Sequence, residues 1–241
     1  MALSDRKYMT RSQADVAGLD VGLRSYMLRV YNYMSLGVAF TGAVAMIVAM
    51  NPAMVQTVAS LFWVLFIGVL GLGFFAPRIM VSKSIAAAQA CFWVYATLWG
   101  LLLGPMLFAY AQIDPMIIAR AFFITAGTFA GMSRFGYTTK RNLGPMGAFL
   151  AMATIGILIA LLVNVFFLQS AGFHLVLSII VVLVFSGLTA YETQVIKNMY
   201  YDADGHDVTT RKAIFGAFML YGSFVTLFIY ILSILGVMRG E

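Results

Sequence analysis

The run FHLVLSIIVVLVFSGLTAYETQVIK, residues 173–197, determines which solvent this chain folds in. At a rise of about 1.5 Å per residue, a helix of this length crosses the ~30 Å hydrocarbon core of a bilayer. Its one acidic residue is Glu192, which lies inside the apolar run rather than after it. Ionised carboxylates are costly in hydrocarbon, so they usually face the bundle interior and have a partner or a functional task. We therefore predict a transmembrane helix here and treat Glu192 as a candidate functional residue.

The rest of the chain has the same apolar character. Of its 241 residues, 62% are hydrophobic and 10% are charged, and the mean hydropathy is +0.94. Soluble domains carry about a quarter charged residues. Apolar runs of roughly 20 residues recur, without the short alternating segments that are typical of outer-membrane barrels. The composition predicts an all-α integral membrane protein, built as a bundle of transmembrane helices.

Proline and glycine signals divide the chain into seven predicted spans, because proline lacks a backbone donor and disfavours a helical predecessor. The spans are 28–50, 58–76, 84–110, 115–135, 146–168, 173–197 and 213–237. Residues 28–241 therefore form one seven-helix transmembrane domain. Residues 1–27 form a polar tail without the apolar core of a signal peptide, so we expect no cleavable signal.

Basic residues set the predicted orientation, because cytoplasmic loops carry an excess of Lys and Arg. Thirteen of the 15 basic residues fall on one side of the seven spans, and the two that do not are Arg120 and Arg239. We therefore expect the N-terminal tail in the cytoplasm and the C-terminus on the opposite side. The basic residues are dispersed over several loops, which argues against a nucleic-acid partner.

Two small-residue motifs predict close helix contacts. Gly100-x-x-x-Gly104 lies in the third span and Gly127-x-x-x-Gly131 in the fourth. Such motifs serve contacts within a bundle or between two copies of a chain, and both uses stay open for this sequence, so the oligomeric state does too. We favour contacts within the bundle for both motifs.

The sequence offers no catalytic constellation. The predicted spans contain no Asp, so an intramembrane aspartyl protease would lack its two carboxylates. His174 and His206 are expected on opposite sides of the membrane and cannot share a metal ion. We predict no enzyme activity, no cofactor and no resident metal.

An acidic stretch lies between the last two predicted spans. Asp202, Asp204 and Asp207 resemble the start of a calcium loop, but His206 occupies the third ligand position and Ala213 the place of the closing Glu. The stretch is either a solvated turn or a weak cation-attracting mouth on the cytoplasmic side.

Polar side chains gather around Glu192 at helical spacing. Ser186, Thr189 and Thr193 share its side of the helix. The last span carries an answering set of hydroxyl groups, at Tyr221, Ser223, Thr226, Tyr230 and Ser233. We predict that these hydroxyls satisfy Glu192 and line a polar path. The alternative is that Glu192 extends to the cytoplasmic interface or pairs with Lys197.

Four segments resemble the transmembrane Bax-inhibitor-motif family, specifically its bacterial members. They are LRVY at 28–31 with SLGVAFTGAVA at 35–45, FAGMSRFGYTTKRNLGPMGAFL at 129–150, GLTAYETQVIK at 187–197 and LYGSFVTLFIYILSILG at 220–236. The resemblance implies an inner-membrane protein with seven helices, in which the last helix is central and the other six surround it. It also implies a pH-sensitive leak of calcium or other cations.

In that family picture, two aspartates on the sixth and seventh spans pair and control closure on the cytoplasmic side. The first falls on Glu192, within Tyr191-Glu192-Thr193-Gln194, and the second on Ser223. A neighbouring family Asn falls on Thr226. Because one carboxyl group opposite a hydroxyl lacks the strong coupling of two carboxyls, we interpret Glu192 as the remaining half of a proton-sensing pair.

The family resemblance also implies a competing role without transport. Some bacterial members act on a membrane-anchored quality-control protease, which they occupy as poor substrates. That role would use an exposed tail such as residues 1–27 and would not need an acid within the membrane. A membrane protease is therefore a second predicted partner class, beside the lipid bilayer.

Overall fold

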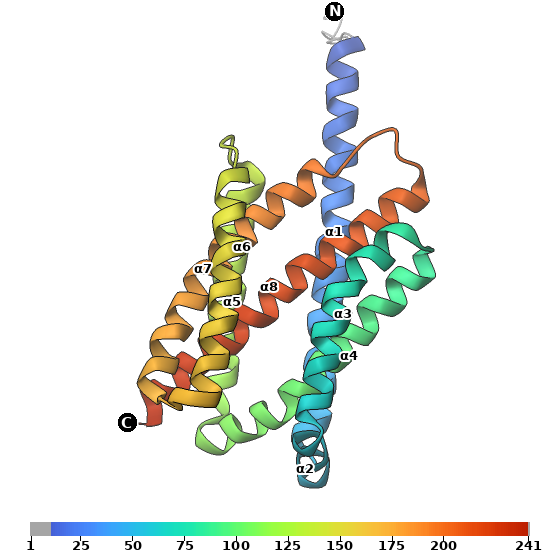
Figure 1. Cartoon of the computed structure of the whole chain (residues 1–241). Helices are drawn as coiled ribbons and strands as arrows, with labels where there is room; N and C mark the ends of the chain where they lie inside the picture. The colour runs from blue at the N-terminus through green and yellow to red at the C-terminus, as the bar shows by residue number, and fades with distance from the viewer. Residues whose placement is uncertain (1–10, 241) are drawn as a thin grey trace, which may run out of the picture.

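The computed structural model describes residues 11–240, and the side chains of residues 21–239. Seven helices in this range are long and apolar enough to cross a membrane, and the range contains no strand. The all-α membrane fold is thus confirmed (Figure 1). The elements are α1 (Arg11–Ala49), α2 (Pro52–Ser60), α3 (Phe62–Ser82), α4 (Ile85–Ile113), α5 (Pro115–Thr138), α6 (Gly144–Val163) with a π-helical turn (Asn164–Leu168), α7 (Ala171–Asn198) and α8 (His206–Gly240).

Local capping explains why several helices begin where the sequence signals fall. The side chain of Asn51 accepts hydrogen bonds from the backbone N–H groups of Ala53 and Met54, so α2 starts there. Asp114 accepts from the N–H of Met116 at the start of α5, and Ser170 caps α7 in the same way. Prolines in the first turns of α2 and α5 fit, because their missing N–H is not needed there.

Several predicted span limits are wrong. The short helix α2 occupies a stretch predicted as a loop together with the first residues of the predicted span 58–76, and α3 starts at Phe62 and continues through Pro77 to Ser82. Neighbouring helices can satisfy the backbone group that an internal proline frees in a membrane helix. Helix α8 begins at His206 rather than near residue 213, because its polar first turns are helical without being apolar. Residues 11–27 of the predicted tail lie within α1, while residues 1–10 are outside the described range.

Helix α8 is the central element. About 61% of its span is buried, against 17–33% for the other six spans. Figure 1 shows α8 crossing obliquely between α1, α3 and α4 on one side and α5, α6 and α7 on the other. It packs against α1, α3, α4, α5 and α7, whereas α6 packs mainly on α7. The central position is confirmed, but five helices rather than six surround α8.

Glycines bring three pairs of helix backbones together. Gly100 and Gly104 of α4 lie against Val44 and Val48 of α1, as predicted for packing within the bundle. A side chain at Gly136 of α5 would overlap the backbone carbonyl of Ala190 in α7, and one at Gly147 of α6 would overlap the ring of Tyr191.

The second predicted glycine motif behaves differently. Gly127 and Gly131 are exposed and have no described atom within 4 Å of an added Cβ, so the expectation that they pack within this bundle is wrong. The motif faces outward because the buried residues of α5, such as Thr125 and Phe129, lie on another side of the helix.

Candidate functional site: a buried carboxyl group between α7 and α8

The carboxyl group of Glu192 lies in the bundle interior, at the contact of α7 with α8. Its side chain is 9% exposed, and Ser223 of α8 is 2% exposed. The hydroxyl of Ser223 donates a hydrogen bond of 2.6 Å to Glu192 Oε2. A hydrogen bond in such a buried place is electrostatically stronger than the same bond in water. The two positions that the family resemblance assigned to a carboxyl pair are therefore in direct contact.

Lys197 does not form the alternative ion pair with Glu192. Its Nζ donates to the backbone carbonyl of Tyr137 at 2.9 Å and lies 5.0 Å from the centroid of that ring. Lys197 therefore connects the cytoplasmic ends predicted for α5 and α7. Glu192 faces Ser223 and the interior instead of extending toward the interface.

The predicted threonines take part in helix contacts other than the one at Glu192. Thr189 and Thr193 are fully buried and donate to carbonyl groups of their own helix. Thr193 Oγ1 also lies 3.0 Å from Ser133 Oγ, which is 2.5 Å from the hydroxyl of Tyr31. A chain of three hydroxyls thus joins α7, α5 and α1. Thr226 donates to the carbonyl of Gly222 in its own helix at 2.9 Å.

The two predicted tyrosines of α8 point to different neighbours. The hydroxyl of Tyr221 lies 2.7 Å from Thr41 Oγ1, and Thr41 donates to the carbonyl of Ala96 at 3.0 Å. Tyr221 therefore faces α1 and α4. Tyr230 packs beside the cluster of Ile157, Leu177 and Val181 between α6 and α7. Tyr221 thus lies on another side of α8 from Ser223, whereas Ser223, Thr226 and Tyr230, spaced by three and four residues, stay on one side of the helix, and Ser223 and Tyr230 both meet α7.

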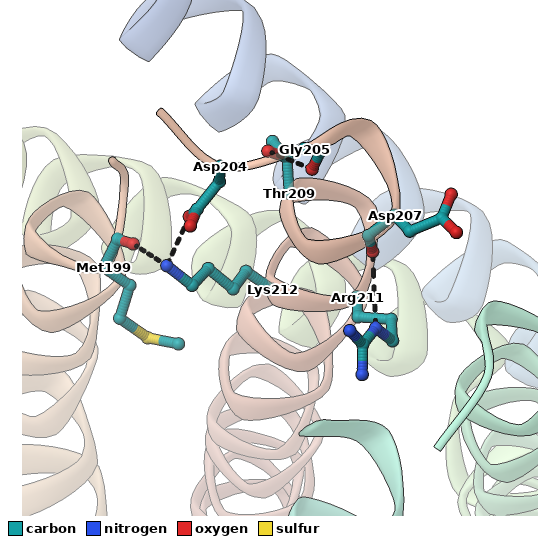
Figure 2. Close-up of polar contacts among 7 residues, drawn as sticks. All are labelled: Met199, Asp204, Gly205, Asp207, Thr209, Arg211 and Lys212. Carbon is teal, nitrogen blue, oxygen red and sulfur yellow. Dashed lines mark hydrogen bonds and ion pairs between the residues drawn. The ribbon is translucent and has the colours of Figure 1, made fainter. Parts of the chain in front are cut away.

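The three aspartates before and within the start of α8 have separate partners, and Figure 2 shows two of them, Asp204 and Asp207. Asp204 Oδ2 lies 2.5 Å from Lys212 Nζ, which also donates to the carbonyl of Met199. Asp202 accepts a hydrogen bond of 3.1 Å from the hydroxyl of Tyr200. The carboxylate of Asp207 points away from Asp204 and Lys212 in Figure 2. Across the described residues, no group of three or more His, Cys, Asp or Glu side chains could hold a metal ion.

Sequence reasoning missed a polar clamp next to Glu192. Gln194 Oε1 accepts from the N–H of Leu143, and its Nε2 donates to the carbonyl of Arg141, each at 2.8 Å. The side chain thereby fixes the connection between α5 and α6 to α7. Tyr31, Ser133 and Gln194 were also missed as contact residues, although all three lie in the segments that carried the family resemblance.

Comparison with known proteins gives matches over nearly the whole chain. The profile of a family described as "Inhibitor of apoptosis-promoting Bax1" matches residues 23–240. The chain is 40% identical over 221 residues to the uncharacterized protein RP147 of Rickettsia prowazekii. This alignment covers 90% of this chain and 91% of the relative. It is 38% identical over 220 residues to the inner membrane protein YbhL of Escherichia coli K12, with coverage of 89% and 92%. An uncharacterized protein of Deinococcus radiodurans is 38% identical over 212 residues, covering 88% and 90%.

Proposed function

The chain belongs to the family of inhibitors of apoptosis-promoting Bax1, as its motifs predicted, and from this membership we propose that it is a proton-sensitive cation leak of the inner membrane. Calcium is the proposed transported ion. The observation that carries the proposal is the buried contact between Glu192 of α7 and Ser223 of the central helix α8. A contact between a titratable group and the central helix is a place where a proton can change helix packing.

Protonation would change this contact in a defined way. An ionised carboxylate only accepts hydrogen bonds, so it holds the Ser223 hydroxyl as a donor. A protonated carboxyl group can donate instead, and it no longer carries the charge that strengthens the bond. The Nζ of Lys197 donates to the carbonyl of Tyr137, so Lys197 does not compensate the charge of Glu192 in this arrangement. The proposed switch is therefore a change in the α7–α8 contact.

The proposed orientation has the N-terminus in the cytoplasm and the C-terminus on the opposite side. The support is the 13 basic residues assigned to one side, which include Lys197, Arg211 and Lys212 around the α7–α8 connection. The two remaining basic residues, Arg120 and Arg239, both form ion pairs with Asp114 at the other end of the bundle. In this orientation Glu192 lies in the cytoplasmic half of the membrane.

Calcium flux into liposomes containing the purified full-length protein tests the proposal. We expect flux in the wild type to change between about pH 5 and pH 8, because a titratable carboxyl group controls the contact. Glu192→Gln, which mimics the protonated form, should conduct without dependence on pH. Asp207→Asn removes an exposed carboxylate of the acidic stretch before the central helix, and a wild-type pH profile in this variant would separate the α7–α8 switch from that stretch. If the wild type gives no flux at any pH, the leak function is wrong. If flux through the Glu192→Gln variant still depends on pH, Glu192 is not the proton-sensing residue.

A second role is regulation of a membrane-anchored protease without transport. The observation that favours it is the N-terminal part of α1, which projects beyond the ends of the other helices (Figure 1). A projecting helix end is accessible to a partner in a way that the packed core is not. Removal of residues 1–20 should then change the turnover of the protease's other substrates in cells, and Glu192→Gln should leave that turnover unchanged. The reverse pattern would favour the leak.

A further inference from the structure

A long hollow lies between α1 and α5 and reaches down to the central helix. Its first part has a volume of about 700 Å³ and is lined by α1, α4, α5 and α8, with the buried Phe224, Val225 and Phe228 as its floor. A second part of about 500 Å³ shares Val38, Gly42 and Phe122 with the first and extends it toward Ser133. We call the combined hollow the α1–α5 groove.

One end of the α1–α5 groove is polar and basic. The hydrogen bond between Tyr31 and Ser133 joins its two walls there. Beyond it lies a third hollow of about 270 Å³, lined by Arg24, Met27, Leu28, Tyr31 and Tyr137. Arg24 is exposed, so its guanidinium is available to a ligand.

Helix α5, which forms the opposite wall, carries a second cation next to this end, although that cation lines none of the three hollows itself. Arg134 is exposed and follows the groove-lining Ala130 of α5 by one helical turn. None of the residues that line the three hollows is acidic. The groove therefore combines an apolar body with a positively charged end, and small residues such as Ala39, Gly42 and Ala126 make room within it.

We propose that the α1–α5 groove binds one anionic phospholipid of the surrounding bilayer. Its phosphate lies between Arg24 and Arg134, and one acyl chain lies along Phe129 and Phe224. Along α1 the groove runs from Tyr31 to Met46, which is roughly 22 Å at the rise of a helix. That length exceeds half of the ~30 Å hydrocarbon core, so the acyl chain of one leaflet fits within it.

The charge at the end of the groove decides the lipid class. A phosphatidylglycerol headgroup keeps its net negative charge, whereas the choline of phosphatidylcholine neutralises it. Each Arg near a membrane surface strengthens anionic lipid binding by about fivefold. Two arginines on facing walls should together favour phosphatidylglycerol over phosphatidylcholine by at least tenfold.

Native mass spectrometry of the purified full-length protein, titrated with phosphatidylglycerol or phosphatidylcholine in detergent, tests this site. We expect the wild type to hold one phosphatidylglycerol with at least a tenfold preference. Arg24→Gln combined with Arg134→Gln should remove the preference. The control combination Arg78→Gln with Lys83→Gln removes two exposed cations at α3 and should keep it.

A variant that fills the groove tests the acyl-chain part separately. Gly42 lines the groove, and no described atom lies within 4 Å of an added Cβ, so Gly42→Phe can fill the space without a backbone clash. Gly156 of α6 is equally open and exposed, which makes Gly156→Phe the matched control. Gly42→Phe should lower phosphatidylglycerol retention at least tenfold relative to Gly156→Phe.

Two results would overturn the proposal. One is equal retention of the two lipids by the wild type, which would indicate ordinary surface lipid only. The other is equal retention by Gly42→Phe and Gly156→Phe when both variants melt like the wild type. If Gly42→Phe melts at a lower temperature than the wild type, the lipid preference of the Arg24→Gln, Arg134→Gln variant decides whether the proposal holds. These two substitutions are at exposed residues and leave the packed interior intact.

Discussion

Ser223 Oγ donates to Glu192 Oε2 across 2.6 Å, and this bond is a buried polar link between the central helix and α7. Leu220 and Leu227, about one helical turn before and after Ser223 on α8, are fully buried. A buried acceptor that loses its donor keeps the full cost of desolvation, so a single hydroxyl has a large influence here.

Ser223→Ala should therefore destabilise the protein by about 1–3 kcal/mol, because the carboxyl group of Glu192 loses its donor while it stays buried. Unfolding by denaturant in detergent micelles measures the change. Ser233→Ala is the matched control: Ser233 is also buried on α8, but it donates to the carbonyl of Ile229 in its own helix. That carbonyl stays within the helix ladder, so the control should lose less stability. Equal losses would mean that the Glu192 contact contributes nothing of its own.

Ser223→Asp should steepen the pH dependence of cation flux. Two carboxyl groups in contact bind their protons at well-separated pH values, because the first charge opposes the second. Flux in liposomes, followed from about pH 5 to pH 8, measures the slope. An unchanged slope would show that position 223 does not take part in proton sensing.

Gly136→Ala should destabilise the contact between α5 and α7 by about 1–3 kcal/mol, because the new methyl group overlaps the carbonyl oxygen of Ala190 and the backbones must separate. Gly127→Ala, on the same helix but in open space, should stabilise by about 0.5–1 kcal/mol through lower backbone entropy in the unfolded chain. Thermal melting of the two variants should shift in opposite directions. A shift of the same sign in both would contradict the close approach of α5 and α7.

Asp114 combines two roles that substitutions can separate. Asp114→Asn keeps the cap on α5, since Asn can still accept from the N–H of Met116, but removes the charge that pairs with Arg239 and Arg120. The arginines are 40% and 52% exposed, so this loss should stay below about 1 kcal/mol and shrink in high salt. Asp114→Ala should lose about 1 kcal/mol more, because the cap is lost too. Denaturant unfolding at two salt concentrations measures both terms, and equal effects of Asn and Ala would contradict the capping role.

A reporter enzyme fused after Glu241 should be active only on the non-cytoplasmic side, because 13 of the 15 basic residues are assigned to the other face. A periplasmic phosphatase and a cytoplasmic fluorescent protein, fused to the same residue, give opposite signals. Fusion within the connection at residues 139–143 serves as the control and should report the cytoplasm. A cytoplasmic signal from the C-terminal fusion would contradict the proposed orientation.

The seven spans and the central last helix could be predicted because apolar length and family motifs carry that information. The helix ends could not, since polar turns such as those at the start of α8 are helical without being apolar. The contact of Glu192 with Ser223 was predictable from two aligned positions in the motifs. Gln194 was missed because its hydrogen-bond partners are backbone groups of the connection between α5 and α6. Backbone groups occur at every residue, so the sequence does not indicate which of them a side chain will contact. The sequence also does not distinguish Gly127 from Gly136. Both are glycines of α5, but Gly127 faces open space, whereas Gly136 lies against the backbone of α7.

The oblique course of α8 also has a mechanical consequence. Its C-terminal end is fastened at Arg239 to Asp114, while Ser223 lies roughly 24 Å along the helix axis from that point. A rigid rotation of α8 by about 10° around that end would displace Ser223 by about 4 Å along an arc of that radius, which is enough to separate it from Glu192. A small angular change of α8 at one end of the bundle would thus suffice to break the bond near the other end.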